Sequence, residues 1–202
     1  MNFNFLNRPL KLVYFDLIVV NWDYFFKKPQ WRHVMNFNKK KFKNVLHYII
    51  SECGLKSNVG KTVIFKLLYF SDFNFFELYE KSLTNESYRK LPRGPAPIHF
   101  DIAITELENE EKIEVKTKKL PLGRVMYNYI SLKEPSSDLT LEEVSVIDEV
   151  ISELSGMNAS QISEYSHGDM PWRATEDGEI IDYGFVFYRD PQYVKRVYDE
   201  SN

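Results

Sequence analysis

The chain has 202 residues, of which 44% are hydrophobic and 15% aromatic, and this composition excludes an intrinsically disordered protein. The length suffices for one domain with a substantial core. The net charge of −3 is uneven, because residues 1–34 carry five basic and two acidic side chains and the remainder therefore carries −6. An acidic surface repels a phosphate backbone, so nucleic acid is disfavoured as the main partner.

Residues 1–34 differ from the rest of the chain, being rich in aromatic residues and asparagine. Their apolar run from Leu12 to Val20 is interrupted by Asp16 and falls well short of the roughly 20 residues that span a bilayer. The segment also lacks the cleavage site of a signal peptide. Two interpretations stay open, an over-long gene start before Met35 and a membrane-surface or partner-binding tail. We adopt the first, which leaves residues 35–202 as the domain.

The first helix is predicted from Asn38 to Cys53, because apolar side chains recur on one face and Gly54 follows as a stop signal (Phe42, Val45, Leu46, Ile49 and Ile50). His47 lies beside this stripe and is interpreted as a packing residue. Cys53 is the single cysteine, so it forms no internal disulfide, and we expect it to be buried. Four lysines form the basic cluster of the domain body and are interpreted as a solvated face, which is also the place to look for any anionic partner (Lys39, Lys40, Lys41 and Lys43).

A second helix is predicted from Val63 to Tyr79, where polar residues are few and large apolar side chains recur at helical spacing (Phe65, Leu68, Tyr69, Phe76 and Tyr79). We expect other elements to surround it as the core of the domain. Asp72 falls on the same face and should therefore point inward, where a carboxylate needs hydrogen-bond donors. Candidate donors follow in the next loop, at Tyr88, Arg89 and Arg93. A structural tie and a ligand contact both remain open for Asp72.

The segment Gly94-Pro95-Ala96-Pro97 is predicted to be a corner after a polar loop, from which a third helix starts. Its apolar side is expected at Ile98, Ile102 and Leu107. Its other side is acidic (Asp101, Glu106, Glu108, Glu110 and Glu111). Residues 111–118 and 123–132 then alternate with period two, which predicts an antiparallel hairpin. Three helices followed by a hairpin are the order of a winged helix, in which the third helix contacts DNA. Because this third helix is acidic, we do not expect it to recognise DNA directly.

Two capping boxes predict the later helices. Thr140 with Glu143 opens a helix that extends to Gly156 with a regular apolar stripe (Leu141, Val144, Ile147, Ile151 and Leu154), and Asn158 with Gln161 opens a shorter one at residues 159–166. Two short strands are expected at residues 179–183 and 185–188. The predicted fold class is α+β and predominantly helical, with a central buried apolar helix packed by surrounding helices, a β-hairpin and short C-terminal strands.

No motif for catalysis is present, neither a phosphate-binding loop nor a nucleophile motif nor a metal-ligand pair at helical spacing. His167 and Asp169 flank a glycine, but two ligands alone are weak evidence for a metal. Nothing in the sequence brings Asp72 and Asp169 together as a catalytic pair. We therefore expect no enzyme, no cofactor and no metal site. Trp172 is interpreted either as an apolar plug or as an interface anchor.

Two blocks of the sequence carry a resemblance to a known family. The first combines KLLYFSDF, SLTNESY and RGPAPIHF, and the second is ISEYSHGDMPW at residues 162–172, followed by Gly178, Ile180 and Tyr183. Together they resemble the Panacea domain, also called the SocA-like antitoxin domain, over residues 35–188. The resemblance implies a bacterial or phage-associated cytoplasmic protein that neutralises a co-encoded toxin by binding it.

The partner that the resemblance implies is a cognate protein toxin, in a toxin–antitoxin system. The alternative is an adaptor that presents a toxin or another client to a protease. Because binding residues concentrate in loops on a rigid scaffold, we expect residues 83–97 and 166–172 to lie side by side and frame the recognition surface. Its anchors are predicted to be Tyr88, Arg93, His167 and Trp172. Asp72, Gly94, Pro95 and Pro97 are assigned to the structural motif that shapes it.

Overall fold

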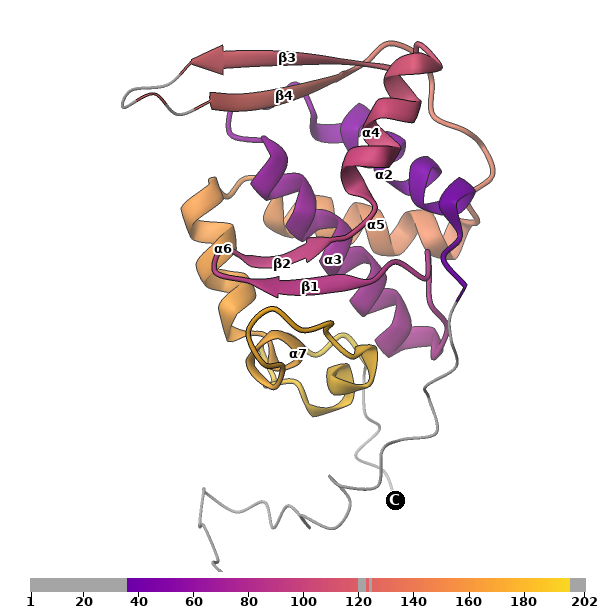
Figure 1. Ribbon diagram of the computed structural model, residues 1–202. Coiled ribbons are helices and arrows are strands. Elements are labelled where there is room, and N and C mark those ends of the chain that lie inside the picture. Colours follow the sequence, from indigo (N-terminus) through magenta and orange to yellow (C-terminus); the bar gives the residue numbers. More distant parts are fainter. Residues whose placement is uncertain (1–35, 120–122, 124, 197–202) are drawn as a thin grey trace, which may run out of the picture. The chain divides into compact units, whose positions relative to one another are not determined.

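The structure, a computed structural model, describes residues 36–119, 123 and 125–196. The prediction that residues 1–34 form a separate extension lies outside the described residues. The predicted fold class is confirmed, since helices predominate and two small antiparallel sheets, β1–β2 and β3–β4, accompany them (Figure 1). Among the described helices, none combines the length and the apolarity needed to cross a membrane.

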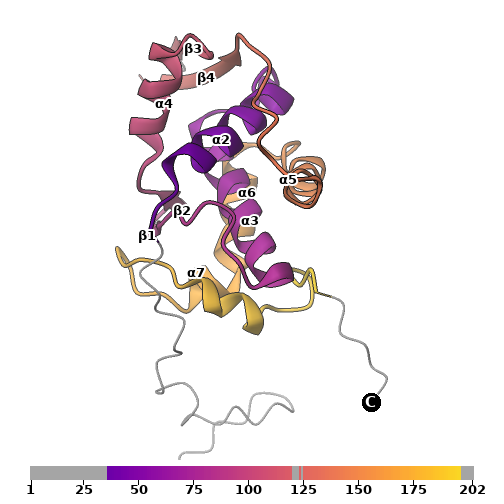
Figure 2. The same cartoon turned by 90° about the vertical axis from the view of Figure 1, so that its right-hand side faces the viewer.

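The centre of the domain is α3 (Lys61–Tyr79), as predicted. It lies between the hairpin of β1 and β2 on one side and α5 on the other (Figure 2), and it also contacts α2 and α6. Leu67, Leu68 and Tyr69 are completely buried, which the apolar sequence requires. The prediction was wrong for Tyr79, which is 41% exposed because it is the last residue of the helix and extends past the packed elements.

Helix α2 (Lys39–Cys53) has the predicted apolar face, and all five stripe residues are at most 1% exposed. Gly54 ends the helix, and a glycine is required there because a Cβ atom would lie only 2.3 Å from the Tyr129 carbonyl oxygen. Cys53 is buried, as expected, and burial raises the pKa of its thiol to about 11. His47 is also buried, and its Nε2 lies 2.9 Å from Ser131 Oγ.

The lysines at the start of α2 do not form a free cationic face. Each of the four forms an ion pair with a carboxylate that is distant in sequence (Lys39–Glu106, Lys40–Asp138, Lys41–Glu143, and Lys43 with Glu106 and Glu110). Two of these carboxylates belong to the acidic side of α4, so the acidic and basic surfaces found in the sequence largely neutralise each other. Lys39 and Lys40 are nevertheless solvent-exposed, as the interpretation of a solvated face requires.

Residues 88–97 form a hairpin rather than a loop and a corner. β1 (Tyr88–Leu91) pairs antiparallel with β2 (Gly94–Pro97), and β1 pairs on its other side with residues 179–181, where Lys90 N donates to Glu179 O over 2.9 Å. Prolines at alternate positions of β2 are compatible with this pairing, because they occupy the outer edge, where no N–H group is required. The sequence suggested a corner because Gly-Pro-x-Pro is also typical of turns.

Helix α4 (Phe100–Asn109) is rotated from the predicted phase. Its buried residues are Phe100, Ala103, Ile104 and Leu107, whereas Ile98 and Ile102 are 45% and 57% exposed. Ile98 precedes the helix, so counting helical spacing from it placed the stripe on the wrong side. Only Leu107 of the predicted face is buried.

The next elements follow the predictions closely. β3 (Ile113–Lys119) pairs with β4 (Val125–Ser131), and Thr140 and Asn158 cap α5 (Leu141–Leu154) and α6 (Ala159–Gly168) with complete capping boxes. Leu141 was wrongly placed in the apolar stripe and is 86% exposed, because it is the first residue of α5 and precedes the packed turns. The short helix α7 (Met170–Arg173) follows α6 directly.

The predicted C-terminal strand pair is absent from the described residues. Ile180 makes only an isolated bridge with Arg89, and residues 183–188 form the 3₁₀ helix η2 (Tyr183–Tyr188). Asp182 caps this helix by accepting a hydrogen bond from Gly184 N. Tyr183 and Val186 are buried three residues apart, which suits a 3₁₀ helix rather than a strand with period two.

Candidate functional site

The two segments expected to frame a recognition surface lie side by side in the structure. Gly94, at the turn of the hairpin, is so close to α6 that a Cβ atom would lie 2.3 Å from Ser166 Oγ and 2.8 Å from Lys66 Cε. Lys90 Nζ of β1 lies 4.3 Å from the centre of the Trp172 ring. We use the name Gly94 cluster for the residues that meet here (Lys66, Lys90, Arg93, Gly94, His167 and Trp172).

Gly94 fixes the shape of this cluster. Its φ of +92° is a conformation that other residues rarely adopt, and the contacts with Ser166 and Lys66 leave no room for a side chain. Pro95 and Pro97 are buried in β2, and the Pro95 carbonyl oxygen accepts a hydrogen bond from Lys66 Nζ over 3.1 Å. The three residues therefore hold the hairpin against α3 and α6, as their assignment to a structural motif requires.

Lys66 is a buried cation in the middle of the apolar helix α3. Its side chain is only 1% exposed, and no carboxylate of the described residues forms an ion pair with it. Burial, together with the nearby positive charge of Arg93, lowers the pKa of Lys66 to about 7. A buried lysine without a carboxylate destabilises the fold unless another interaction compensates.

His167 and Trp172 form a stacked pair between the end of α6 and α7. Their ring centres are 4.2 Å apart and the planes differ by 19°. Both rings are partly exposed, yet His167 Nε2 and Trp172 Nε1 are buried and have no hydrogen-bond partner among the described residues. Burial and the charge of Lys66 lower the pKa of His167, which favours a neutral ring.

Arg93 and Tyr88 occupy very different environments. Arg93 is exposed at the tip of the hairpin, and its guanidinium makes no hydrogen bond or ion pair with any described residue. Tyr88 is completely buried, so its side chain does not reach the surface where we expected it to contact a partner. The residue follows Ser87 in a polar stretch, and sequence alone did not reveal that β1 turns this side chain toward α3.

Tyr88 instead belongs to the environment of Asp72, which points inward as predicted. The tyrosine hydroxyl donates to Asp72 Oδ2 over 2.6 Å, and Thr84 donates to the same carboxylate from both its backbone N–H and its hydroxyl. Burial raises the pKa of Asp72 to about 7, and these hydrogen bonds limit the increase. Neither arginine named as a donor contacts Asp72, since Arg89 donates to Gly178 O. Asp72 therefore ties α3 to the residues before β1.

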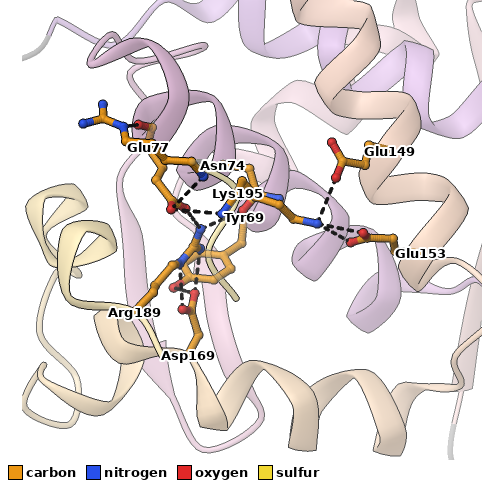
Figure 3. A network of polar contacts seen from close by, with 9 residues as sticks. Tyr69, Asn74, Glu77, Glu149, Glu153, Asp169, Arg189 and Lys195 are labelled. Carbon is orange, nitrogen blue, oxygen red and sulfur yellow. Dashed lines mark hydrogen bonds and ion pairs between the residues drawn. The ribbon is translucent and has the colours of Figure 1, made fainter. Parts of the chain in front are cut away.

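A second buried polar network, which the sequence did not reveal, closes the C-terminal segment over α3 (Figure 3). The Arg189 guanidinium donates to both oxygens of Asp169 over 2.9 Å and to Glu77 and Asn74 of α3 over 2.8 Å. Tyr69 also donates to Asp169. Charge-assisted bonds of this kind hold buried ions that would otherwise be unstable.

The two carboxylates that were considered as a catalytic pair have different hydrogen-bond partners. Asp72 bonds to Thr84 and Tyr88, whereas Asp169 bonds to Arg189 and Tyr69. His167 stacks on Trp172. Within the described part of the chain, no group of three or more His, Cys, Asp and Glu side chains is arranged to hold a metal ion.

The sequence match decides the family. The family described as "Antitoxin SocA-like, Panacea domain" matches residues 64–173, which are more than half of the chain. The chain belongs to this family. The comparisons with curated proteins and with solved structures each gave no match.

The matched part of this Panacea domain begins within α3 and ends with α7. It therefore contains the whole Gly94 cluster and the Asp72 environment, and it leaves out α2 and Arg189. The resemblance noted in the sequence is confirmed, although the match is shorter than the expected span. Sequence reasoning did not select Lys66 and Lys90 for the Panacea site, although Lys66 was detectable as a lone lysine within an apolar helix.

Proposed function

We propose that this Panacea domain neutralises a cognate protein toxin by binding it directly, without chemistry of its own, in the cytoplasm. Membership of a family described as antitoxin SocA-like carries the proposal. The Gly94 cluster supports it, because an exposed arginine at the tip of the hairpin lies near a stacked aromatic pair at α6 and α7, and arginine and tryptophan are frequent anchors of protein interfaces. Residues 35–202 form the functional unit of this proposal.

The anchor residues have two roles in this proposal. Arg93, His167 and Trp172 contact the toxin, while Gly94, Pro95 and Pro97 fix the hairpin beside α6. Tyr88 supports the surface from below through Asp72, because it is completely buried. Arg89 is exposed and donates to Gly178 O, and Lys90 lies over the Trp172 ring.

Co-expression with the toxin encoded beside this protein tests the proposal. Arg93→Ala and His167→Phe should abolish neutralisation while leaving the melting temperature near that of the wild type, because neither side chain fills the core. Lys116→Ala, on the exposed part of β3, is the control and should neutralise normally. The proposal fails if the Arg93 and His167 variants protect cells as well as the control.

Measuring the amount of toxin separates direct neutralisation from the adaptor alternative. Direct binding predicts a stable complex and an unchanged toxin level. A toxin level that falls when this protein is expressed, and recovers when the protease is deleted, would instead establish delivery to a protease.

A further inference from the structure

The Gly94 cluster contains hydrogen-bond donors whose bonding capacity is largely unused within the described residues. Trp172 Nε1 can only donate, and both it and His167 Nε2 are buried without a partner there. Lys66 carries three N–H donors when protonated and has one acceptor, the Pro95 carbonyl oxygen. Buried polar groups are normally satisfied, so this concentration of unused donors requires an explanation.

Of the three cations in the cluster, Lys90 pairs with Asp177, whereas Lys66 and Arg93 have no carboxylate partner among the described residues. Arg93 pairs with no acidic side chain of the described residues, and it directly precedes Gly94, where a Cβ atom would lie 3.2 Å from Lys66 Nζ. Burial and the positive charge of Arg93 lower the pKa of Lys66. Burial and the positive charge of Lys66 in turn lower the pKa of His167. Like charges that repel each other in a partly buried place are stabilised when an anion enters between them.

The lysines of α2 and the buried Arg189 do not show this pattern. The lysines of α2 are all engaged by carboxylates, although two surface cavities of about 290 and 280 Å³ lie beside them. Arg189, whose side chain is completely buried, already contacts Asp169 and Glu77. Arg93 and Lys66 therefore differ from these cations in lacking a counterion among the described residues.

We propose that the Gly94 cluster binds a carboxylate of the toxin, with Arg93 making contact at the surface and Lys66, His167 and Trp172 completing the site. This proposal rests on the function proposed above and adds the chemistry of the contact. A guanidinium binds a carboxylate with two parallel hydrogen bonds, and N–H donors of indole and imidazole suit the same acceptor oxygens. An acidic residue or the C-terminal carboxylate of the toxin has the required chemistry.

Acetate tests the site without any toxin. In the full-length protein, sodium acetate should shift the indole N–H resonance of Trp172 in a saturable manner, whereas sodium chloride at the same ionic strength should not. Trp172→Phe identifies this resonance among the three tryptophans. Arg93→Glu should remove the response, and Arg89→Glu, the same charge change on the same hairpin, should retain it. No acetate-specific shift, or an equal shift in Arg93→Glu, would overturn the proposal.

The toxin neutralised in the co-expression experiment provides the second measurement. Arg93→Glu should weaken its binding by at least about tenfold, because the substitution replaces attraction by repulsion, and Arg89→Glu should change it little. If acetate binds but the Arg93→Glu protein binds toxin as tightly as the wild type, the toxin does not supply the carboxylate and the proposal is wrong. If the wild-type protein binds acetate but no toxin, the proposed function is refuted, although the carboxylate site itself is supported.

Discussion

Asp72 is stabilised by hydroxyl and amide donors from the residues before β1. Thr84 and Tyr88 both donate to it, and the Tyr88 hydroxyl would lose its acceptor if the carboxylate were removed. A buried donor without an acceptor destabilises a protein by about 1–3 kcal/mol. The interaction therefore links a residue of α3 to the position of the hairpin that shapes the Gly94 cluster.

We predict that Asp72→Leu lowers the free energy of unfolding by about 1–3 kcal/mol and that Asp72→Asn lowers it less, because asparagine retains one carbonyl oxygen as an acceptor. Denaturant unfolding of both variants measures the difference. Thr84→Val removes one donor from the other side of the contact and should lower the stability less than Asp72→Leu, because the Thr84 N–H and the Tyr88 hydroxyl still donate to Asp72. Equal stability of all four proteins would contradict the role of Asp72.

Lys66 should make the stability depend on pH. The pKa is about 7 in the folded protein and near the ordinary value of 10.5 in the unfolded chain, so between these values the unfolded chain binds a proton that the folded protein lacks. The free energy of unfolding therefore rises with pH across this range, by up to about 1.4 kcal/mol per pH unit. Asp72, with a pKa raised to about 7, and Cys53, raised to about 11, contribute little between about pH 7.5 and 8.5.

The measurement compares the wild type with Lys66→Met, which keeps an unbranched side chain, one atom shorter, and removes the charge. We predict that denaturant midpoints of the wild type increase from about pH 7.5 to about pH 8.5 and that those of Lys66→Met stay nearly constant. An equal increase of the denaturant midpoint with pH in both proteins would show that a group other than Lys66 causes the pH dependence.

At the scale of elements, the buried Arg189 is one of the residues that hold the C-terminal segment against α3. Arg189 joins α3 to the residue that follows α6, and the neighbouring backbone N–H of Lys195 donates to Glu77 over 3.0 Å. The side chain of Lys195 then reaches Glu149 and Glu153 of α5 (Figure 3). These contacts cover α3 with a segment that lies beyond the matched Panacea region.

We predict that Arg189→Met lowers the free energy of unfolding by about 3–5 kcal/mol, because it leaves Asp169 and Glu77 as buried charges without a cation. Arg173→Met is the matched control, since Arg173 pairs with Asp190 at the surface and such pairs contribute about 0–1 kcal/mol. Thermal and denaturant unfolding measure both. Similar losses in the two variants would mean that the buried network contributes no more than a surface ion pair.

For the whole molecule, one hydrophobic core extends from α2 to the residues after η2, with α3 at its centre. We predict that a shortened protein beginning at Met35 unfolds cooperatively, with a melting temperature close to that of the full chain, and that it retains toxin neutralisation. The reason is that α2 to η2 already provide this core. Loss of cooperative unfolding or of neutralisation would show that residues 1–34 are required.

The sequence by itself determined the elements whose signals are local. The capping boxes at Thr140 and Asn158, the apolar stripe of α2 and the alternation in β3 and β4 all depend on residues a few positions apart, and each was predicted correctly. The family also followed from two short blocks, and the match over residues 64–173 confirmed it. The inward direction of Asp72 followed from helical spacing alone.

Only the tertiary structure decided which side chains meet across the domain. Tyr88 is buried and Arg93 is exposed although they stand five residues apart, because the hairpin turns one toward α3 and the other outward. Arg189 and the lysines of α2 pair with carboxylates that are distant in sequence, such as Glu77 in the case of Arg189. The spacing of residues along the chain does not predict such pairs. The donor-rich Gly94 cluster arises in the same way, because α3, the hairpin and α6 bring its residues together. Its positive charges repel one another, and the packing of the whole domain keeps them close despite this repulsion.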